Sequence, residues 1–135
     1  MIFVDTSVWV AFLRGRDVAL VERMRAVLDS EEVALAAPVR IEVLSGASPR
    51  DLPRLRRLLG AFALFVPTTD TWHLVDEWID RAARSSQRFG AMDLLIGALA
   101  AEQEAPLWSL DRDFEYGPFA KHPYTTYVTG TNTRV

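Results

Sequence analysis

Hydrophobic positions along the chain alternate between short continuous runs and longer stretches in which they recur at helical spacing. Short apolar runs are typical of buried strands, and apolar residues three or four positions apart are typical of helices packed on one side. The short runs predict strands at residues 2–4, 33–37, 64–66, 107–110 and 124–128. The spaced positions predict helices that begin near residues 8, 20, 39, 52 and 70, and residues 94–101 are apolar nearly all round, as in a helix buried within the domain.

Residues that start or end helices set the bounds of several of these segments. Gly15 ends the first helix, Pro38 suits the start of the third, and Gly46 ends it. Thr69 or Asp70 is expected to cap the fifth helix. The predicted core face of the fifth helix consists of Trp72, Val75, Ile79 and Ala82 or Ala83, and that of the fourth consists of Leu52, Leu55, Leu58, Leu59 and Phe62.

The alternation of strands with helices predicts an α/β fold, because consecutive strands joined by helices run parallel in a sheet that helices cover on both faces. The chain contains no internal repeat, low-complexity tract or linker. Its 135 residues can bury a substantial core as one unit. We therefore expect a single domain over residues 1–135.

Composition narrows the class of protein. Half of the residues are hydrophobic and 24% are charged, which is ordinary for a globular domain, and the lack of cysteine excludes disulfides and thiolate metal sites. A net charge of −3 argues against coating nucleic acid by bulk charge, so any nucleic acid is expected to be a substrate. Residues 1–5 form no basic leader, and no apolar run approaches the roughly 20 residues of a membrane span. A cytoplasmic protein without a membrane segment is expected.

Carboxylates lie where predicted strands end or helices begin, in four stretches far apart in the chain. The residues are Asp5, Glu42, Asp93 and the pair Asp111 and Asp113. Ligands bind at the carboxyl ends of the strands in open parallel sheets. Several carboxylates at such an edge would repel each other unless cations lie between them. The pattern therefore predicts a Mg²⁺ or Mn²⁺ site, which suits phosphodiester cleavage.

Each carboxylate also has a plainer interpretation. Asp5 could cap the first helix, although the hydroxyls of Thr6 and Ser7 already offer that capping role. Glu42 could belong to a solvated helix face. Asp93 could interact with the dipole of the buried helix, which would keep this carboxylate ionised.

Asp111 and Asp113 are one residue apart, so in an extended or turn conformation their side chains are expected to point in different directions. We expect only one of them to face a cation directly. Asp111 is preferred because it lies nearer to the end of the predicted strand.

Together these stretches resemble the motifs of PIN-domain ribonucleases, specifically the VapC-type toxins of bacterial and archaeal toxin–antitoxin pairs. The matching segments are Val4-Asp5-Thr6-Ser7, Ile41-Glu42, Asp93-Leu94-Leu95-Ile96 and Ser109-Leu110-Asp111-Arg112-Asp113-Phe114. Each segment alone is a weak signal, but the combination is specific and covers nearly the whole chain. The resemblance implies a three-layer α/β/α fold with a central, mostly parallel sheet of four to five strands flanked by helices.

The resemblance also implies roles for individual residues. Asp5, Glu42, Asp93 and Asp111 match the catalytic, metal-binding acids of the family, which hold one or two Mg²⁺ or Mn²⁺ ions, and Asp113 is an auxiliary acid. Small hydroxyl positions that orient ligands or water are matched by Thr6, Ser7 and Ser109. The arginines nearest to the motifs, and hence the candidates for holding the RNA backbone, are Arg14, Arg16, Arg40 and Arg112.

By the same resemblance, the expected activity is endonucleolytic RNA cleavage, neutralised by a cognate antitoxin protein. A homodimer and a higher toxin–antitoxin assembly are expected as well. We expect the antitoxin between the first, second and fourth helices, in an apolar groove lined by Phe12, Leu13, Leu55 and Leu59 beside Arg14 and Arg16. The alternative is a catalytically inactive PIN-fold module that binds RNA or protein, which the intact set of acids disfavours.

Overall fold

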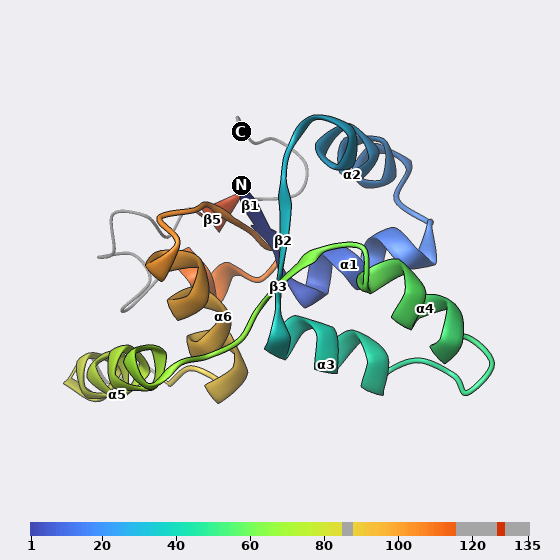
Figure 1. Cartoon of the computed structure of the whole chain (residues 1–135). Coiled ribbons are helices and arrows are strands. Elements are labelled where there is room, and N and C mark those ends of the chain that lie inside the picture. Colours follow the sequence, from blue (N-terminus) through green and yellow to red (C-terminus); the bar gives the residue numbers. More distant parts are fainter. Residues whose placement is uncertain (85–87, 116–126, 129–135) are drawn as a thin grey trace.

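A five-stranded parallel sheet forms the centre of the computed structural model, which describes residues 1–84, 88–115 and 127–128 (Figure 1). The strands are β1 (Ile2–Val4), β2 (Val33–Ala36), β3 (Ala63–Phe65), β4 (Leu107–Trp108) and β5 (Tyr127–Val128). Their order is β3-β2-β1-β4-β5, and every neighbouring pair is parallel. Residues 124–126 of the predicted last strand lie outside the described residues.

The strand order reverses beside β1, because β2 pairs with one edge of β1 and β4 pairs with the other. In the register of these pairs, Phe3 lies opposite Ala34 in β2 and Leu107 in β4. Such a reversal leaves a crevice at the carboxyl ends of the two strands that part there. In this protein the switch point lies after β1 and β4, where Asp5 and Ser109 follow.

Helices flank the sheet, as the alternating sequence pattern predicts. They are α1 (Thr6–Arg14), α2 (Val18–Ser30), α3 (Ala37–Ser45), α4 (Leu52–Leu59), α5 (Thr69–Arg84) and α6 (Ala91–Glu102), followed by the short 3₁₀ turn η1 (Arg112–Glu115). In Figure 1, α5 and α6 lie to the left of β1–β3, and α1 to α4 lie to the right. The predicted α/β/α architecture is confirmed, and none of these helices is long and apolar enough to cross a membrane.

Several helix ends lie where the sequence predicts them. Gly15 closes α1 with φ at 69°, a left-handed conformation that glycine adopts without steric cost, and its N–H donates to the carbonyls of Ala11 and Phe12. Pro38 lies in the first turn of α3, and Gly46 follows the end of this helix. Residues 94–101 of α6 are all buried, as expected.

The predicted core face of α5 is confirmed at Val75 and Ala82 and wrong at Trp72 and Ile79. Trp72 and Ile79 are 54% and 48% exposed, and the buried face consists of Thr71, Val75, Trp78 and Ala82. Apolar residues surround much of this helix, so their spacing alone allows either stripe to face the core. The Thr71 hydroxyl donates to Glu102 of α6 over 2.6 Å, which orients the observed stripe toward α6.

Two further expectations about helix ends are wrong. The Thr68 hydroxyl, one residue before the predicted cap, accepts the Thr71 N–H, because the helix begins at Thr69 itself. The fourth helix ends at Leu59, so Phe62 lies beyond it, and Leu58 is exposed. Phe62 instead packs edge-on against Trp9 of α1, with 5.4 Å between the ring centroids.

Candidate active site

Asp5 lies at this switch point, directly after β1, and is 4% exposed. It occupies the N-cap position of α1, yet its side chain makes no capping hydrogen bond. Its Oδ2 instead accepts the hydroxyls of Ser7 and Ser109, each over 2.8 Å. The capping interpretation therefore does not describe this carboxylate, whose orientation is set by two hydroxyl donors on separate elements.

The same two serines hold the segment after β4 against the start of α1. Ser109 is fully buried, and its hydroxyl accepts the N–H of Asp111 over 2.9 Å. The Ser7 hydroxyl accepts the N–H of Leu110 over 3.0 Å. These bonds place Asp111 beside Asp5, although more than one hundred residues separate them in the chain.

Glu42 reaches the site from α3. It is half-buried, and its Oε1 accepts the Thr6 hydroxyl over 2.8 Å. Thr6 is the first residue of α1, so this bond ties α3 to the end of β1. A freely solvated helix face, the plain interpretation of Glu42, is not what the structure has.

The closest group of acidic side chains consists of Asp93, Asp111 and Asp113, whose ligand oxygens all lie within 4.8 Å of one another. The expectation that Asp111 and Asp113 point in different directions is wrong. The chain after Asp111 turns into η1, and the Asp113 N–H donates to Asp111 Oδ1 over 2.9 Å. Alternate residues share one face even in an extended strand, so this spacing does not separate the two side chains, and the turn at η1 keeps them on one side.

The charge of the cluster acts most clearly on Asp93, in the first turn of α6. Burial raises the pKa of this carboxyl from 3.8 to about 6, with further contributions from the charges of Asp111, Asp5, Glu42 and Asp113 in that order. The helix dipole was expected to hold Asp93 ionised. Desolvation and four neighbouring carboxylates outweigh it, which indicates that all five acids share one region.

The four candidate arginines do not neutralise this region. Arg14, Arg16 and Arg112 are exposed and Arg40 is half-buried. The ion pair between Arg54 and Asp51 involves none of these four arginines and none of the acids of the site. An acidic cluster that forms no ion pair with these four arginines suits a divalent cation, since hard cations prefer carboxylate oxygens. Contact of these arginines with RNA stays a prediction.

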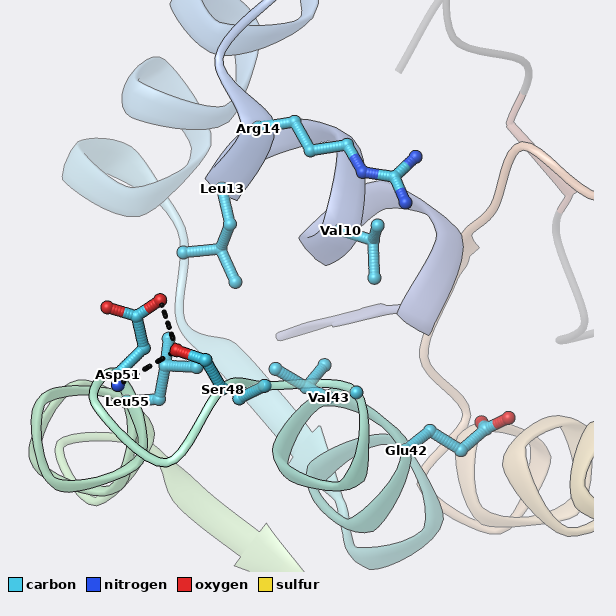
Figure 2. A pocket seen from close by; sticks show the side chains of 10 residues that line it. Val10, Leu13, Arg14, Glu42, Val43, Ser48, Asp51 and Leu55 are labelled. Atoms are coloured by element: carbon cyan, nitrogen blue, oxygen red, sulfur yellow. Dashed lines mark hydrogen bonds between the residues drawn. The ribbon is translucent and has the colours of Figure 1, made fainter.

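A groove with a volume of about 330 Å³ lies between α1, α3 and α4 and ends at Glu42 (Figure 2). Its apolar lining comes from Val10, Leu13, Val43 and Leu55. Figure 2 shows Glu42 at one end and Asp51 and Ser48 at the other, where the Ser48 hydroxyl donates to Asp51 over 3.1 Å. Arg14 lines the groove as well.

The expected position of the groove is therefore partly wrong. Leu13, Leu55 and Arg14 line it as predicted, but α3 takes the place of the second helix. Leu59 is buried in the core and does not line the groove, and neither do Phe12 and Arg16. The apolar face of α2 is buried through Leu20, Met24 and Val27, so it leaves no surface for a groove. Val10, which also lines the groove, could have been predicted, because it lies three residues before Leu13 and therefore on the same face of α1.

Comparisons with known proteins agree with this fold. The sequence model of the PIN domain matches residues 2–119. Ribonuclease VapC11 of Mycobacterium tuberculosis is 33% identical over 128 residues, which cover 85% of this chain and 90% of that protein. Ribonuclease VapC19 of the same species is 29% identical over 92% of this chain and its own full length.

Solved structures show the same fold. VapBC-1 from nontypeable Haemophilus influenzae matches with a TM-score of 0.76 and 16% identity, over 98% of this chain and 100% of that one. At this identity the likeness concerns the fold alone.

Proposed function

The chain belongs to the PIN-domain family, and from this membership we propose that it is a metal-dependent endoribonuclease acting in the cytoplasm as the toxin of a toxin–antitoxin pair. The similar VapC proteins are named ribonucleases, and similar structures are VapBC complexes. The observation that carries the proposal is the convergence of four carboxylates on a fifth, Asp93, whose pKa burial and these charges raise. The comparisons contain nothing that favours an inactive binding module.

The acids suit a Mg²⁺ or Mn²⁺ ion by their chemistry and spacing. Asp93, Asp111 and Asp113 would hold the ion. Asp5 and Glu42 are near enough for their carboxylates to interact with its charge. Hard cations of this kind take carboxylate oxygens as ligands. When bound, such an ion supplies Lewis-acid activation of water and neutralises charge on the scissile phosphate.

The contribution of the protein is to hold the carboxylates in place. Ser7 and Ser109 both donate to Oδ2 of Asp5, so among the described residues its Oδ1 has no hydrogen-bond donor and is left for a ligand. Thr6 holds Oε1 of Glu42 in the same manner. Side chains locked before the substrate arrives need no reorganisation in the transition state.

The groove beside Glu42 is the proposed docking site of the antitoxin. Its apolar walls suit an apolar segment of a partner protein. The polar residues at its ends, Asp51 at one and Arg14 with Glu42 at the other, would fix the direction in which that segment lies. Glu42 belongs both to the groove and to the acidic site. A segment bound in the groove would therefore cover one edge of the site and hinder access of RNA. Homodimerisation stays an expectation from the family.

Cleavage of RNA by the purified chain tests the function. We expect activity with Mg²⁺ or Mn²⁺ and none in excess chelator. Asp5→Asn and Asp93→Asn should each reduce kcat/KM on the order of a hundredfold or more, since each weakens the site that activates water. Asp80→Asn, an exposed change on α5, is the matched control and should cleave as the wild type does. RNA binding without cleavage by the wild type would favour the inactive module instead.

A further inference from the structure

We propose that a stripe of three arginines, on α4 and the turn before it, binds the phosphate backbone of RNA at a distance from the acidic site. The residues of this arginine stripe are Arg50, Arg54 and Arg57, and all three are exposed. The inference rests on the proposed ribonuclease function and adds a second surface that contacts the substrate. The acidic site cleaves the RNA, and the arginine stripe holds a more distant part of the same molecule.

The stripe is a consequence of helical spacing. The N–H of Leu52 donates to the carbonyl of Ser48 over 3.1 Å, a bond between residues four apart that extends the helical turn back from α4 to include Arg50. Arg50, Arg54 and Arg57 are then four and three residues apart. Side chains at this spacing lie above one another on one face of a helix, with about 5–6 Å between neighbouring Cβ atoms. The three charges therefore form one row.

The buried face of α4 is a different one. Leu55 and Leu59 are 7% and 1% exposed, and Leu55 also lines the groove that ends at Glu42. The residues that line this groove from α4 and its preceding turn are Ser48, Asp51 and Leu55, not the arginines of the stripe. A partner segment seated in the groove does not need the arginine stripe, which stays open to another ligand.

Positive charge is concentrated on this part of the chain. Between residues 44 and 66, four arginines accompany a single acid, Asp51, although the whole chain has a net charge of −3. Arg54 forms an ion pair with Asp51, with 3.6 Å between Nη2 and Oδ1, yet 73% of the Arg54 side chain is exposed. An exposed pair of this kind is weak, because water screens it. The guanidinium of Arg54 is therefore accessible to an anionic ligand.

Helix stability does not explain the arginine stripe. Like charges three or four residues apart destabilise a helix. Cations stabilise the last turn of a helix, where Arg57 lies, but they oppose the dipole at the start, where Arg50 and Arg54 lie. Exposed charges that cost stability are expected at functional surfaces, where binding compensates for them.

Phosphate is the chemical group that fits the stripe. Guanidinium groups bind phosphate oxygens through paired hydrogen bonds, and RNA carries a phosphate at every nucleotide. The carboxylates of the acidic site repel the same backbone wherever no cation intervenes. Basic residues away from these carboxylates are therefore needed to hold the RNA, and a row of three arginines on one helix supplies them.

The arginine stripe lies apart from the acids of the site. Figure 2 shows Glu42 at one end of the groove and Asp51 at the other, and the stripe begins with Arg50, next to Asp51 in the chain. An RNA that contacts both surfaces must extend beyond the nucleotides beside the cleaved bond. We therefore expect the protein to bind long RNA more tightly than a short fragment that contains the same cleaved bond.

Binding of RNA in chelator tests the stripe without cleavage. The probe is a labelled single-stranded RNA of about 30 nucleotides and mixed sequence, followed by fluorescence anisotropy at several salt concentrations. The triple variant Arg50→Gln, Arg54→Gln, Arg57→Gln should weaken binding roughly tenfold or more at low salt. It should also lower the slope of log affinity against log salt by about 2, because each phosphate contact on a single strand contributes roughly 0.7. Each single variant should lower the slope by about a third of this amount.

Two further triple variants separate local contact from net charge. The variant Arg25→Gln, Arg81→Gln, Arg84→Gln removes three exposed arginines from α2 and α5 and should keep the wild-type slope. Replacement of the three stripe arginines by lysine keeps the charges and should keep most of the slope, with some loss of affinity because lysine cannot form paired bonds. Equal losses in the stripe variant and the control variant would overturn the proposal, since general charge would then explain the binding.

Cleavage with Mn²⁺ tests the distance between the two surfaces. On a long RNA that the wild type cleaves, the glutamine variant of the stripe should raise KM roughly tenfold. On a fragment of about six nucleotides around the cleaved bond, its KM should match that of the wild type, because the fragment does not reach the stripe. Equal losses on the long RNA and the fragment would overturn the proposal.

The outcomes distinguish the stripe from the nuclease. A wild type that binds RNA and loses affinity in the stripe variant, but cleaves no RNA with Mn²⁺, would refute the nuclease and support the stripe. Cleavage by a stripe variant with wild-type affinity and slope would refute the stripe and leave the nuclease intact. Stripe variants that lose affinity for the antitoxin and not for RNA would show that the arginines bind an acidic protein segment, which also overturns the proposal.

Discussion

Neutralising Asp93 should stabilise the protein when no divalent cation is present. The carboxyl of Asp93 has its pKa raised from 3.8 to about 6, chiefly by burial and by the charges of Asp111 and Asp5. A shift of this size corresponds to roughly 3 kcal/mol when it is fully expressed. Because Asp93 is only half-buried, solvent screening lowers the expected effect to about 1–2 kcal/mol.

The direction of the pH dependence follows from proton binding. A carboxyl with a higher pKa in the folded state binds more protons there than in the unfolded chain, so stability falls as pH rises from about 4 to above 6. In chelator, Asp93→Asn should therefore be more stable than the wild type by about 1–2 kcal/mol at pH 7.5, which is several degrees in Tm. The difference should shrink toward pH 5, where the wild-type carboxyl becomes protonated.

Manganese should close most of this difference in stability. An ion at about ten times its Kd stabilises the wild type by roughly 1.4 kcal/mol, and Asp93→Asn should respond less because a ligand is gone. The assay is thermal unfolding of both proteins at pH 5.5 and 7.5, with chelator and with manganese. Asp80→Asn, exposed on α5, controls for the general effect of removing one negative charge. A wild type indifferent to manganese at pH 7.5, and no less stable than Asp93→Asn in chelator, would mean that the carboxylates do not converge.

The remaining predictions concern the hydroxyls and the groove. Ser109→Ala should lower the free energy of unfolding by about 1–3 kcal/mol in urea titrations, because the buried Asp5 loses a donor, and unchanged stability would contradict the role of that bond. Thr6→Val should lower kcat about tenfold, with recovery in Thr6→Ser, since only the hydroxyl holds Glu42; equal rates in the two variants would refute this. Leu13→Asp and Leu55→Asp should each weaken antitoxin binding at least tenfold by calorimetry, and intact affinity in both would place the antitoxin elsewhere.

The sequence by itself predicted most elements of the fold and the chain positions of the acids. Strands and helices follow from local spacing of apolar residues, which depends on neighbours only a few positions away. Gly15 and the all-apolar stretch of α6 are local signals of the same kind, and both are confirmed. Asp5 could be placed at a ligand-binding edge because the end of a buried strand is visible in the sequence.

Tertiary structure decided the features that depend on distances between remote residues. The stripe of α5 that faces the core was chosen by contact with α6, through Thr71 and Glu102, because both stripes of the helix are apolar enough to be buried. Glu42 lies at the site because it accepts the hydroxyl of Thr6, which is 36 residues away in the chain. Asp113 lies beside Asp111 because the chain turns into η1, where the Asp113 N–H donates to Asp111 Oδ1. The pKa of Asp93 is raised, not lowered. Desolvation and Coulomb energies depend on how closely the fold packs carboxylates from four segments of the chain. No local pattern in the sequence records those distances.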